Sequence, residues 1–228
     1  MKLTHVELRN WRNFAHIEFD LNTRLFVVGP NASGKSNLLD ALRFISDVAN
    51  AGLYEASTKK RDNFQSIVHG DAEGCSLAFR FDNSVMQGYE LSLNKAYAPI
   101  IYEGEEVGEE LADVSAVEAE HIITADGAVR LPPQVSHLWG QDVADPYETI
   151  LQSATRSTSF KSIRDYFVGI HYIHPNPKKM LERGRYDEHA TGFTQRVASR
   201  PDAVLKPAIA RIRPILASIV PEIPRLSY

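Results

Sequence analysis

The sequence predicts an α/β fold in which an antiparallel, β-rich part precedes a mainly helical C-terminal part. Three patterns lead to this prediction. A short apolar run, Leu25–Val28, enters a glycine-containing turn that is followed by a helical pattern. Residues 75–93 alternate apolar and polar side chains, which is typical of half-buried antiparallel strands. Beyond Pro146, the apolar residues recur at helical spacing instead.

The N-terminal part is expected to form three strands before its first helix. Leu3–Leu8 and Phe14–Phe19 are two predicted strands, joined by residues 9–13. The four consecutive apolar residues of Leu25–Val28 predict a third strand that is buried. The helix that follows begins near Ser36, and its apolar stripe consists of Leu38, Leu42, Ile45 and Val48.

The middle of the chain is expected to contain hairpins. Cys75–Phe81 and Tyr89–Leu93 are predicted strands separated by a turn at residues 82–84, after a polar connection at residues 57–61. A second predicted hairpin, His121–Thr124 with Val129–Leu131, turns at an Asp-Gly pair. The only cysteine, Cys75, excludes an internal disulfide and is expected in the core.

The last third is expected to contain two helices, Tyr147–Thr155 and Phe160–Phe167, and a strand, Gly169–His174. A final helix is expected after Asp202, divided or kinked by two prolines.

Charge is distributed unevenly along the chain. The net charge is −4, but residues 1–155 hold 12 Lys and Arg against 23 Asp and Glu, whereas residues 156–228 hold 13 against 6. Nine carboxylates and no basic residue lie in 101–126, which favours a solvated acidic surface. The basic residues of the last third could bind nucleic acid or face the acidic segment of the same or another chain. They include Lys178, Lys179, Arg183, Arg185, Arg196 and Arg200.

The glycine-containing turn has the pattern of a phosphate-binding loop. Residues 29–36 are GPNASGKS, which matches G-x-x-x-x-G-K-[ST]. Gly29 and Gly34 would allow backbone N–H groups to surround a polyphosphate. Lys35 would contact the β- and γ-phosphates, and the Ser36 hydroxyl would bind Mg²⁺ at the start of a helix. The expected ligand is therefore Mg-ATP or Mg-GTP.

Two stretches resemble a known family. LTHVELRNWRNF (residues 3–14) and GPNASGKSNLLDAL (residues 29–42) are similar to the start of ATP-binding-cassette-type ATPase heads. That group includes RecF, the SMC proteins, OLD-family nucleases and bacterial AAA family ATPases. The resemblance implies a P-loop NTPase of the ABC-ATPase head type with a mixed sheet, and ATP rather than GTP.

The resemblance also implies site residues. Lys35 is the expected catalytic residue and Ser36 the expected Mg²⁺ ligand. Gln65 is a further candidate beside the metal, because relatives place lobe-joining residues in its region. Ala32 stands where many relatives have glycine. The expected nucleotide contacts are Arg12, Asn13, Gly29, Pro30, Asn31, Ala32, Ser33, Gly34, Lys35, Ser36 and Asn37.

Hydrolysis in this group requires elements that the sequence lacks. No run of four apolar residues is followed by Asp-Glu, and no Leu-Ser-Gly-Gly-like signature occurs. The expected function is Mg-ATP binding by the N-terminal lobe of an ABC/RecF-like AAA family ATPase, with the chain alone inactive or very slow. The alternative is a non-hydrolysing, nucleotide-dependent regulatory or DNA-clamping module. Expected partners are ATP and a head-to-head dimer or second ATPase half, with DNA as a further candidate.

The predicted organisation is an incomplete ABC-type head in three parts. A P-loop core spans 1–95, an acidic β-rich insertion 96–145, and a basic, mainly helical segment 146–228. The sequence has no run of about eighteen apolar residues and no signal-peptide core. A cytoplasmic protein with no membrane association is expected.

Overall fold

The computed structural model describes residues 1–102, 105–131, 134–138, 141–153, 158–173, 177–181, 189–191, 196, 199–201, 203, 206–207 and 210–211. The chain forms two compact units, Met1–Ile170 and His171–Tyr228. The first unit contains the sheet and the helices that carry the candidate site. In the second unit, one short helix, α4 (Pro177–Leu181), is described. Among the described residues, none of the helices combines the length and the apolar character needed to span a membrane.

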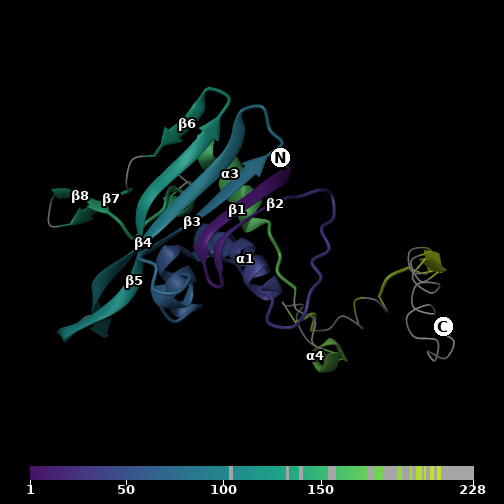
Figure 1. Ribbon diagram of the computed structural model, residues 1–228, viewed down its shortest axis with the longest axis horizontal. Coiled ribbons are helices and arrows are strands. Elements are labelled where there is room, and N and C mark those ends of the chain that lie inside the picture. Colours follow the sequence, from purple (N-terminus) through teal and green to yellow (C-terminus); the bar gives the residue numbers. More distant parts are fainter. Residues whose placement is uncertain are drawn as a thin grey trace. The chain divides into compact units, whose positions relative to one another are not determined.

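A six-stranded sheet forms the framework of the first unit, with strand order β2-β1-β3-β4-β5-β6 and antiparallel pairing throughout (Figure 1). Its strands are β1 (Leu3–Trp11), β2 (Phe14–Asp20), β3 (Gly74–Phe81), β4 (Met86–Tyr102), β5 (Glu105–Thr124) and β6 (Gly127–Arg130). A separate two-stranded sheet joins β7 (Gln134–Leu138) to β8 (Gln141–Asp145). The helices are α1 (Lys35–Ala51), α2 (Ile150–Ser153) and α3 (Thr158–Val168), with a π-helical turn, η1 (Glu55–Lys59), and a 3₁₀ turn, η2 (Phe64–Ser66).

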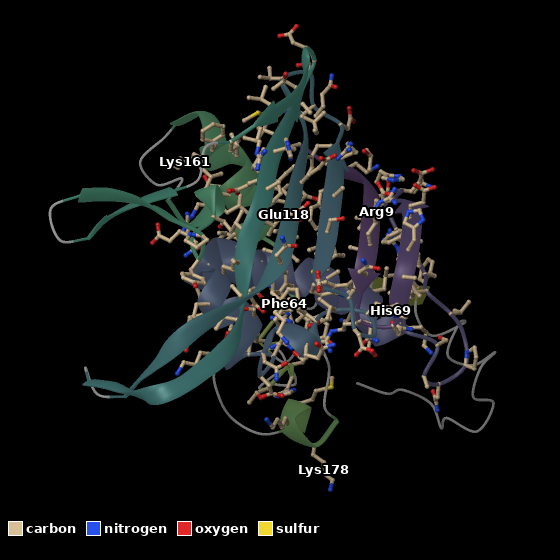
Figure 2. The ribbon with its side chains drawn as sticks, turned by 60° about the vertical axis from the view of Figure 1, so that its left-hand side comes forward. Arg9, Phe64, His69, Glu118, Lys161 and Lys178 are labelled. Atoms are coloured by element: carbon tan, nitrogen blue, oxygen red, sulfur yellow. The ribbon has the colours of Figure 1, made fainter. Side chains whose placement is uncertain are left out.

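One face of the sheet carries the core. Side chains at alternate positions of β1, β3 and β4 are buried, and their neighbours lie on the opposite face, where polar residues such as Arg9 of β1 and Glu118 of β5 occur (Figure 2). Phe167 of α3 packs edge-on against Phe79 and Tyr89, with ring centroids 5.1 and 5.7 Å apart. Trp11 lies 5.1 Å from the ring of Phe44 on α1. Both helices therefore cover the apolar face of the sheet.

Most of the predicted elements are confirmed. β1 to β4 contain the strands predicted from alternation, β5 and β6 form the predicted hairpin around Gly127, and α1 and α3 contain the predicted helices. Cys75 is buried, and burial raises the pKa of its thiol to about 12. The strands β7 and β8 were not foreseen. The helix predicted from Tyr147 starts later in the structure, where α2 begins at Ile150, and residues 154–155 of that prediction lie outside the described residues.

The prediction of a buried strand at Leu25–Val28 is wrong. These residues form no strand, and the side chains of Phe26 and Val28 are 82% and 89% exposed. A buried strand needs hydrogen-bonded neighbours, and no described strand pairs with this run. The antiparallel part of the predicted mixed sheet is therefore present, but this segment does not join it.

The last third of the chain differs in part from its predicted elements where it is described. The strand predicted at Gly169–His174 is wrong over residues 169–173, which have no strand structure, because Ile170 packs onto the helical core instead of joining a sheet. His174 and most of the helix predicted after Asp202 lie outside the described residues. The predicted three-part division stays a prediction; β4 runs through its first boundary, and the first compact unit continues to Ile170.

Candidate functional site: the phosphate-binding loop

The candidate loop, residues 29–34, lies between the exposed 22–28 segment and the start of α1. It turns tightly, with a backbone contact of 3.4 Å from the Ser33 N–H to the Pro30 carbonyl. Ala32 and Gly34 have φ angles of +64° and +92°. The two left-handed residues fold the chain back toward α1, which begins at Lys35. The loop thus enters a helix N-terminus directly.

Gly34 is required by both its conformation and its surroundings. Left-handed φ is costly for residues with a Cβ atom. A Cβ at this position would also collide with the Asn13 amide and lie 2.7 Å from the Phe14 ring. Asn13 accepts a 2.8 Å hydrogen bond from the amide of Asn37 in the first turn of α1. The turn between β1 and β2 therefore packs directly on the loop.

The N-terminus of α1 is suited to an anion. Gly34 provides no side-chain cap, and the first turn contains no acidic residue. The first N–H groups of a helix lack intrahelical acceptors, and its dipole is positive at this end. The ammonium of Lys35 folds back onto the loop and donates to the carbonyls of Gly29 and Pro30, at 2.8 and 2.6 Å. Positive charge and backbone donors therefore converge on one turn.

Ser36 and Gln65 are the two predicted residues for Mg²⁺. Ser36 is exposed in the first turn of α1, and its hydroxyl has no hydrogen bond within the described part of the chain, so it is available to a metal. Gln65, in η2, is also exposed, but its amide donates to the Gly70 carbonyl. No contact in the described ranges brings Gln65 to Ser36 or Lys35. The structure therefore leaves the role of Gln65 without support.

Arg12 lies on the turn that packs against α1. Its Nε donates to Oδ2 of Asp40 at 2.7 Å, and its side chain is 26% exposed. Its N–H donates to Ile67, and its carbonyl contacts the ring of His69, which lies beside the end of the β1–β2 hairpin (Figure 2). Trp11 donates from its indole nitrogen to the Asn37 carbonyl at 3.0 Å. Residues 11–13 are thus fixed to the first two turns of α1.

Sequence reasoning missed the charged residues that support this arrangement. The connection at residues 57–61 was expected to be polar, but Arg61 is buried, with its side chain 4% exposed. Arg61 binds both oxygens of Asp40, and it also donates to Asp47 at 3.0 Å. A charge pattern alone cannot identify such a pair, because Asp40 and Arg61 are 21 residues apart.

A second titratable cluster occupies the opposite face of the sheet. One ligand atom from each of Glu7, His16 and Glu18 lies within 4.8 Å of the others. Burial acts to raise the pKa of Glu7, but the His16 hydrogen bond and the Arg9 charge outweigh it and lower the pKa. These contacts, at 3.0 and 2.5 Å, explain the cluster as an exposed ion-pair group.

Away from the loop, Glu120 is a buried carboxylate on β5. It accepts a 2.6 Å hydrogen bond from the Tyr89 hydroxyl and hydrogen bonds from the Ile150 N–H at the start of α2. Burial raises the pKa of Glu120, although these hydrogen bonds oppose the effect. Burial, with the nearby Glu120 charge, also raises the pKa of Tyr89. The group fixes α2 to the sheet.

A family model and several known proteins match parts of this chain. Residues 25–112 match the family model described as "AAA domain, putative AbiEii toxin, Type IV TA system". The DNA replication and repair protein RecF of Haemophilus ducreyi is 27% identical over 133 residues, covering 58% of this chain and 35% of that protein. RecF of Desulforamulus reducens is 27% identical over 182 residues, covering 73% and 45%. The chain thus spans less than half the length of these relatives.

One solved structure also aligns along most of the chain. It comes from work on the ATP-driven dimerization and DNA-stimulated activation of SMC ATPases, with 16% identity, coverage of 92% of this chain and 99% of that one, and a TM-score of 0.32. Residues 25–112 are thus similar to an AAA domain and a longer stretch is similar to RecF, and these similarities support a likeness to the N-terminal part of an ABC/RecF-like P-loop ATPase.

Proposed function

We propose that this chain binds Mg-ATP through residues 29–36, as the nucleotide-binding lobe of an ABC/RecF-like AAA family ATPase. The observation that carries the proposal is the junction of loop and helix. There, Lys35 folds over the loop carbonyls beside an uncapped helix N-terminus. A triphosphate would replace those carbonyls as the partner of the Lys35 ammonium, with the N–H groups at the start of α1 as donors to the phosphate oxygens.

The surrounding residues would have distinct tasks. The Ser36 hydroxyl would hold Mg²⁺, which neutralises charge on the β- and γ-phosphates when bound. Arg12 would place a second positive charge beside the phosphates, and Asn13 would keep the β1–β2 turn on the loop through Asn37. The remaining predicted contacts, from Gly29 to Ser33, form the loop itself. Gln65 stays a candidate that its hydrogen bond to Gly70 does not favour.

The first test is nucleotide binding by Lys35→Ala. Loss of the ammonium should weaken binding of a fluorescent ATP analogue in the presence of Mg²⁺ by roughly tenfold or more, because hydrogen bonds to charged groups are the stronger ones. Lys59→Ala is the matched control, since Lys59 is exposed and the charge change is the same. Equal affinity of Lys35→Ala and the wild type would refute the proposal.

A non-hydrolysing regulatory or DNA-clamping role is the second candidate. It is favoured by the lack, in this sequence, of an apolar run ending in Asp-Glu that would polarise the attacking water. We expect the chain alone to bind ATP with no turnover or very slow turnover. Phosphate release measured at saturating ATP distinguishes the two candidates. If the isolated chain hydrolyses ATP and Lys35→Ala abolishes this turnover, the ATPase is favoured over the non-hydrolysing module.

We also propose binding partners for this chain, because it resembles RecF-like ATPases. We expect a cytoplasmic protein whose nucleotide site is completed by a second copy or by a second ATPase half. The RecF relatives are proteins of DNA replication and repair, so DNA is the candidate polymer. Affinity for duplex DNA should then fall steeply as salt is raised. Sedimentation with and without a non-hydrolysable ATP analogue would test the dimer.

A further inference from the structure

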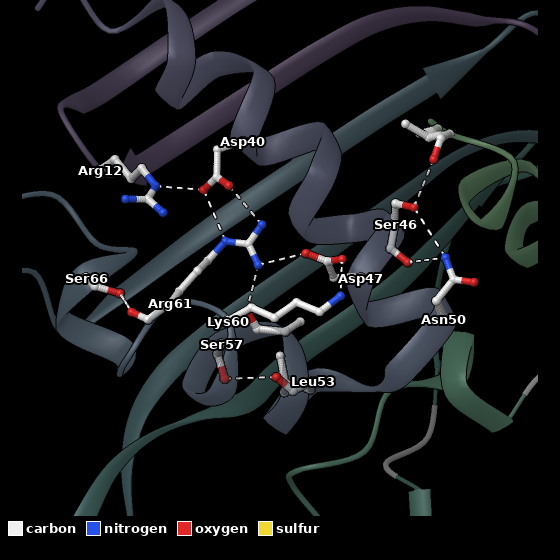
Figure 3. Close-up of polar contacts among 12 residues, drawn as sticks. Arg12, Asp40, Ser46, Asp47, Asn50, Leu53, Ser57, Lys60, Arg61 and Ser66 are labelled. Carbon is white, nitrogen blue, oxygen red and sulfur yellow. Dashed lines mark hydrogen bonds and ion pairs between the residues drawn. The ribbon is translucent and has the colours of Figure 1, made fainter. Parts of the chain in front are cut away.

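We infer that Asp40 is the residue that positions Arg12 for the bound phosphates, and that buried Arg61 fixes Asp40 for this task. The inference rests on the proposed nucleotide site. It adds a positioning residue that contacts no nucleotide itself. Figure 3 shows the chain of contacts, from Arg12 on the β1–β2 turn through Asp40 on α1 to Arg61.

The backbone around Arg12 is fixed close to the loop. Its two neighbours contact α1, Trp11 through the Asn37 carbonyl and Asn13 through the Asn37 amide. Asn13 also lies against the backbone of Gly34, the last residue of the loop. Arg12 itself has a φ angle of +48°, a conformation that non-glycine residues seldom adopt. The turn therefore holds the backbone of Arg12 close to the end of the loop, with its side chain on Asp40 of α1.

Asp40 holds the guanidinium of Arg12 by one edge. The contact is through Nε, at 2.7 Å, and within the described part of the chain the two terminal nitrogens of Arg12 make no hydrogen bond. A guanidinium carries five N–H donors in a planar fork, so four remain for phosphate oxygens. Holding Nε restricts the rotation of a flexible side chain and thereby reduces the entropy lost when a phosphate binds.

Arg61 keeps Asp40 in place. Its Nε and Nη2 bind the two oxygens of Asp40, at 3.1 and 2.9 Å, in a bidentate pair. Its Nη1 binds Asp47 and the Ala56 carbonyl, and its guanidinium lies 5.1 Å over the ring of Phe44. With so many fixed partners, Arg61 has little freedom to move. Asp40 is therefore a rigid support.

The charges agree with this division of tasks. Arg12, Lys60 and Arg61 oppose Asp40 and Asp47, which leaves one positive charge in excess. Since Arg61 is buried between the two carboxylates and Lys60 pairs with Asp47, the excess lies with Arg12. The Asp40 carboxylate is matched by Arg61, so it can hold Arg12 without presenting an uncompensated negative charge to the phosphates.

A double-mutant cycle on the full chain tests the inference, with the affinity of a fluorescent ATP analogue as the readout. Arg12→Ala should weaken binding roughly tenfold, and Asp40→Asn several-fold. In the Arg12→Ala background, Asp40→Asn should have no further effect beyond about twofold, because a positioning residue acts only through its target. A merely structural role would give the same loss in both backgrounds.

Controls separate the explanations. Asp62→Asn makes the same charge change at an exposed site and should leave affinity unchanged. If Asp40→Asn does not fold, Asp40→Ala in the same cycle replaces it, with thermal unfolding recorded for each variant. Unchanged or tighter binding by Asp40→Asn, or equal losses in both backgrounds, would overturn the inference. If Lys35→Ala loses ATP binding but Arg12→Ala does not, the role of Asp40 is refuted and the proposed nucleotide binding stands. If the wild type binds no ATP, both proposals are refuted.

Discussion

The two ends of α1 differ in almost every physical property. The first turn is uncapped and half or fully exposed at Lys35 and Ser36, whereas Phe44 to Ala49 are all buried. The buried end packs on the sheet and on α3, and Asp47 there is held by two cations. At the first end, Leu38 reaches the core, and Asn37 is bound by the turn between β1 and β2. Stability and ligand binding are therefore assigned to opposite ends of one helix.

This separation has a physical reason. A helix N-terminus can bind an anion only if its N–H groups are left without partners, which costs stability unless the rest of the helix is well packed. The buried half provides that packing. If the comparison is correct, substitutions at the two ends will change two different measurements.

The largest change in stability is expected for Ile45→Ala. Ile45 is fully buried, so its truncation should lower the free energy of unfolding by about 2–5 kcal/mol, through lost burial and the cavity left behind. Nucleotide affinity of the folded protein should not change. Leu39→Ala, on the same helix but 44% exposed, is the control and should cost less than about 0.5 kcal/mol. Chemical denaturation measures the free energy of unfolding of the two variants, and ATP titration measures their nucleotide affinity. A folded Ile45→Ala protein that binds ATP weakly would show that the buried end of α1 also controls nucleotide binding.

Gly34→Ala should show the reverse. Left-handed backbone costs alanine about 1–2 kcal/mol, and the new methyl group would displace Asn13 or Phe14. The loop can relieve this strain by changing shape, because it is exposed. We therefore expect a small loss of stability and a loss of ATP binding of tenfold or more. Gly70→Ala, another glycine with positive φ but with open space around it, is the control and should leave ATP affinity unchanged. Retained affinity in Gly34→Ala would show that the loop does not need its observed shape.

The apolar patterns in the sequence predicted buried strands correctly only where the chain supplies a partner strand. Strands β1, β3 and β4 could be predicted because their alternation is matched by partners that the chain supplies, as in the pairing of Leu77 with Leu8 and Leu91. Leu25–Val28 has an equally clear apolar pattern, but a pattern cannot say whether a partner strand is present. The prediction of burial therefore failed where no neighbour pairs with the run.

The candidate site was predictable only where its chemistry is local. The loop and Lys35 follow from eight consecutive residues, and the class that they define agrees with the family match. Arg12 and Arg61 meet at Asp40 because the β1–β2 turn and the segment after η1 both pack on α1. Such contacts between distant residues leave no periodic signal in a single sequence. The predicted phosphate contact of Arg12 remains a prediction.

A buried titratable group near the C-terminal end of α1 makes the stability of that end dependent on pH. Leu53, two residues after the end of α1, donates from its N–H to Gln152 of α2 at 3.1 Å, and Glu120 binds the start of α2. Because the folded pKa of Glu120 is raised, the folded state favours its protonated form. Its contribution to stability is fully present below the unfolded pKa of 4.5 and is lost as pH rises through the folded pKa.

Glu120→Gln should therefore remove part of the decline in stability above pH 4.5, at about 1.4 kcal/mol for each unit by which the pKa is raised. Denaturation at several pH values between 4 and 8 measures this slope. Glu118→Gln is the control, on the same strand but on the opposite, accessible face. ATP affinity should not follow the Glu120 titration. A parallel change in affinity would mean that the two ends of α1 are coupled.

The smallest effect is expected for Ala32→Gly, which acts on the exposed end alone. Ala32 has a φ of +64°, so glycine should relieve left-handed strain of roughly 1–2 kcal/mol. Glycine also gives the unfolded chain more freedom, which offsets roughly 0.4–1 kcal/mol of the gain. Asn31→Gly is the matched control. Asn31 has no positive φ, so this substitution relieves no strain and only gives the unfolded chain more freedom. Since the loop can open without unfolding the core, the difference should appear as slower amide exchange over residues 29–34 in Ala32→Gly, with little change in melting temperature. Faster exchange in Ala32→Gly than in the wild type would mean that the loop does not hold the left-handed turn in solution, and the geometry on which phosphate binding depends would then have to form only when nucleotide arrives.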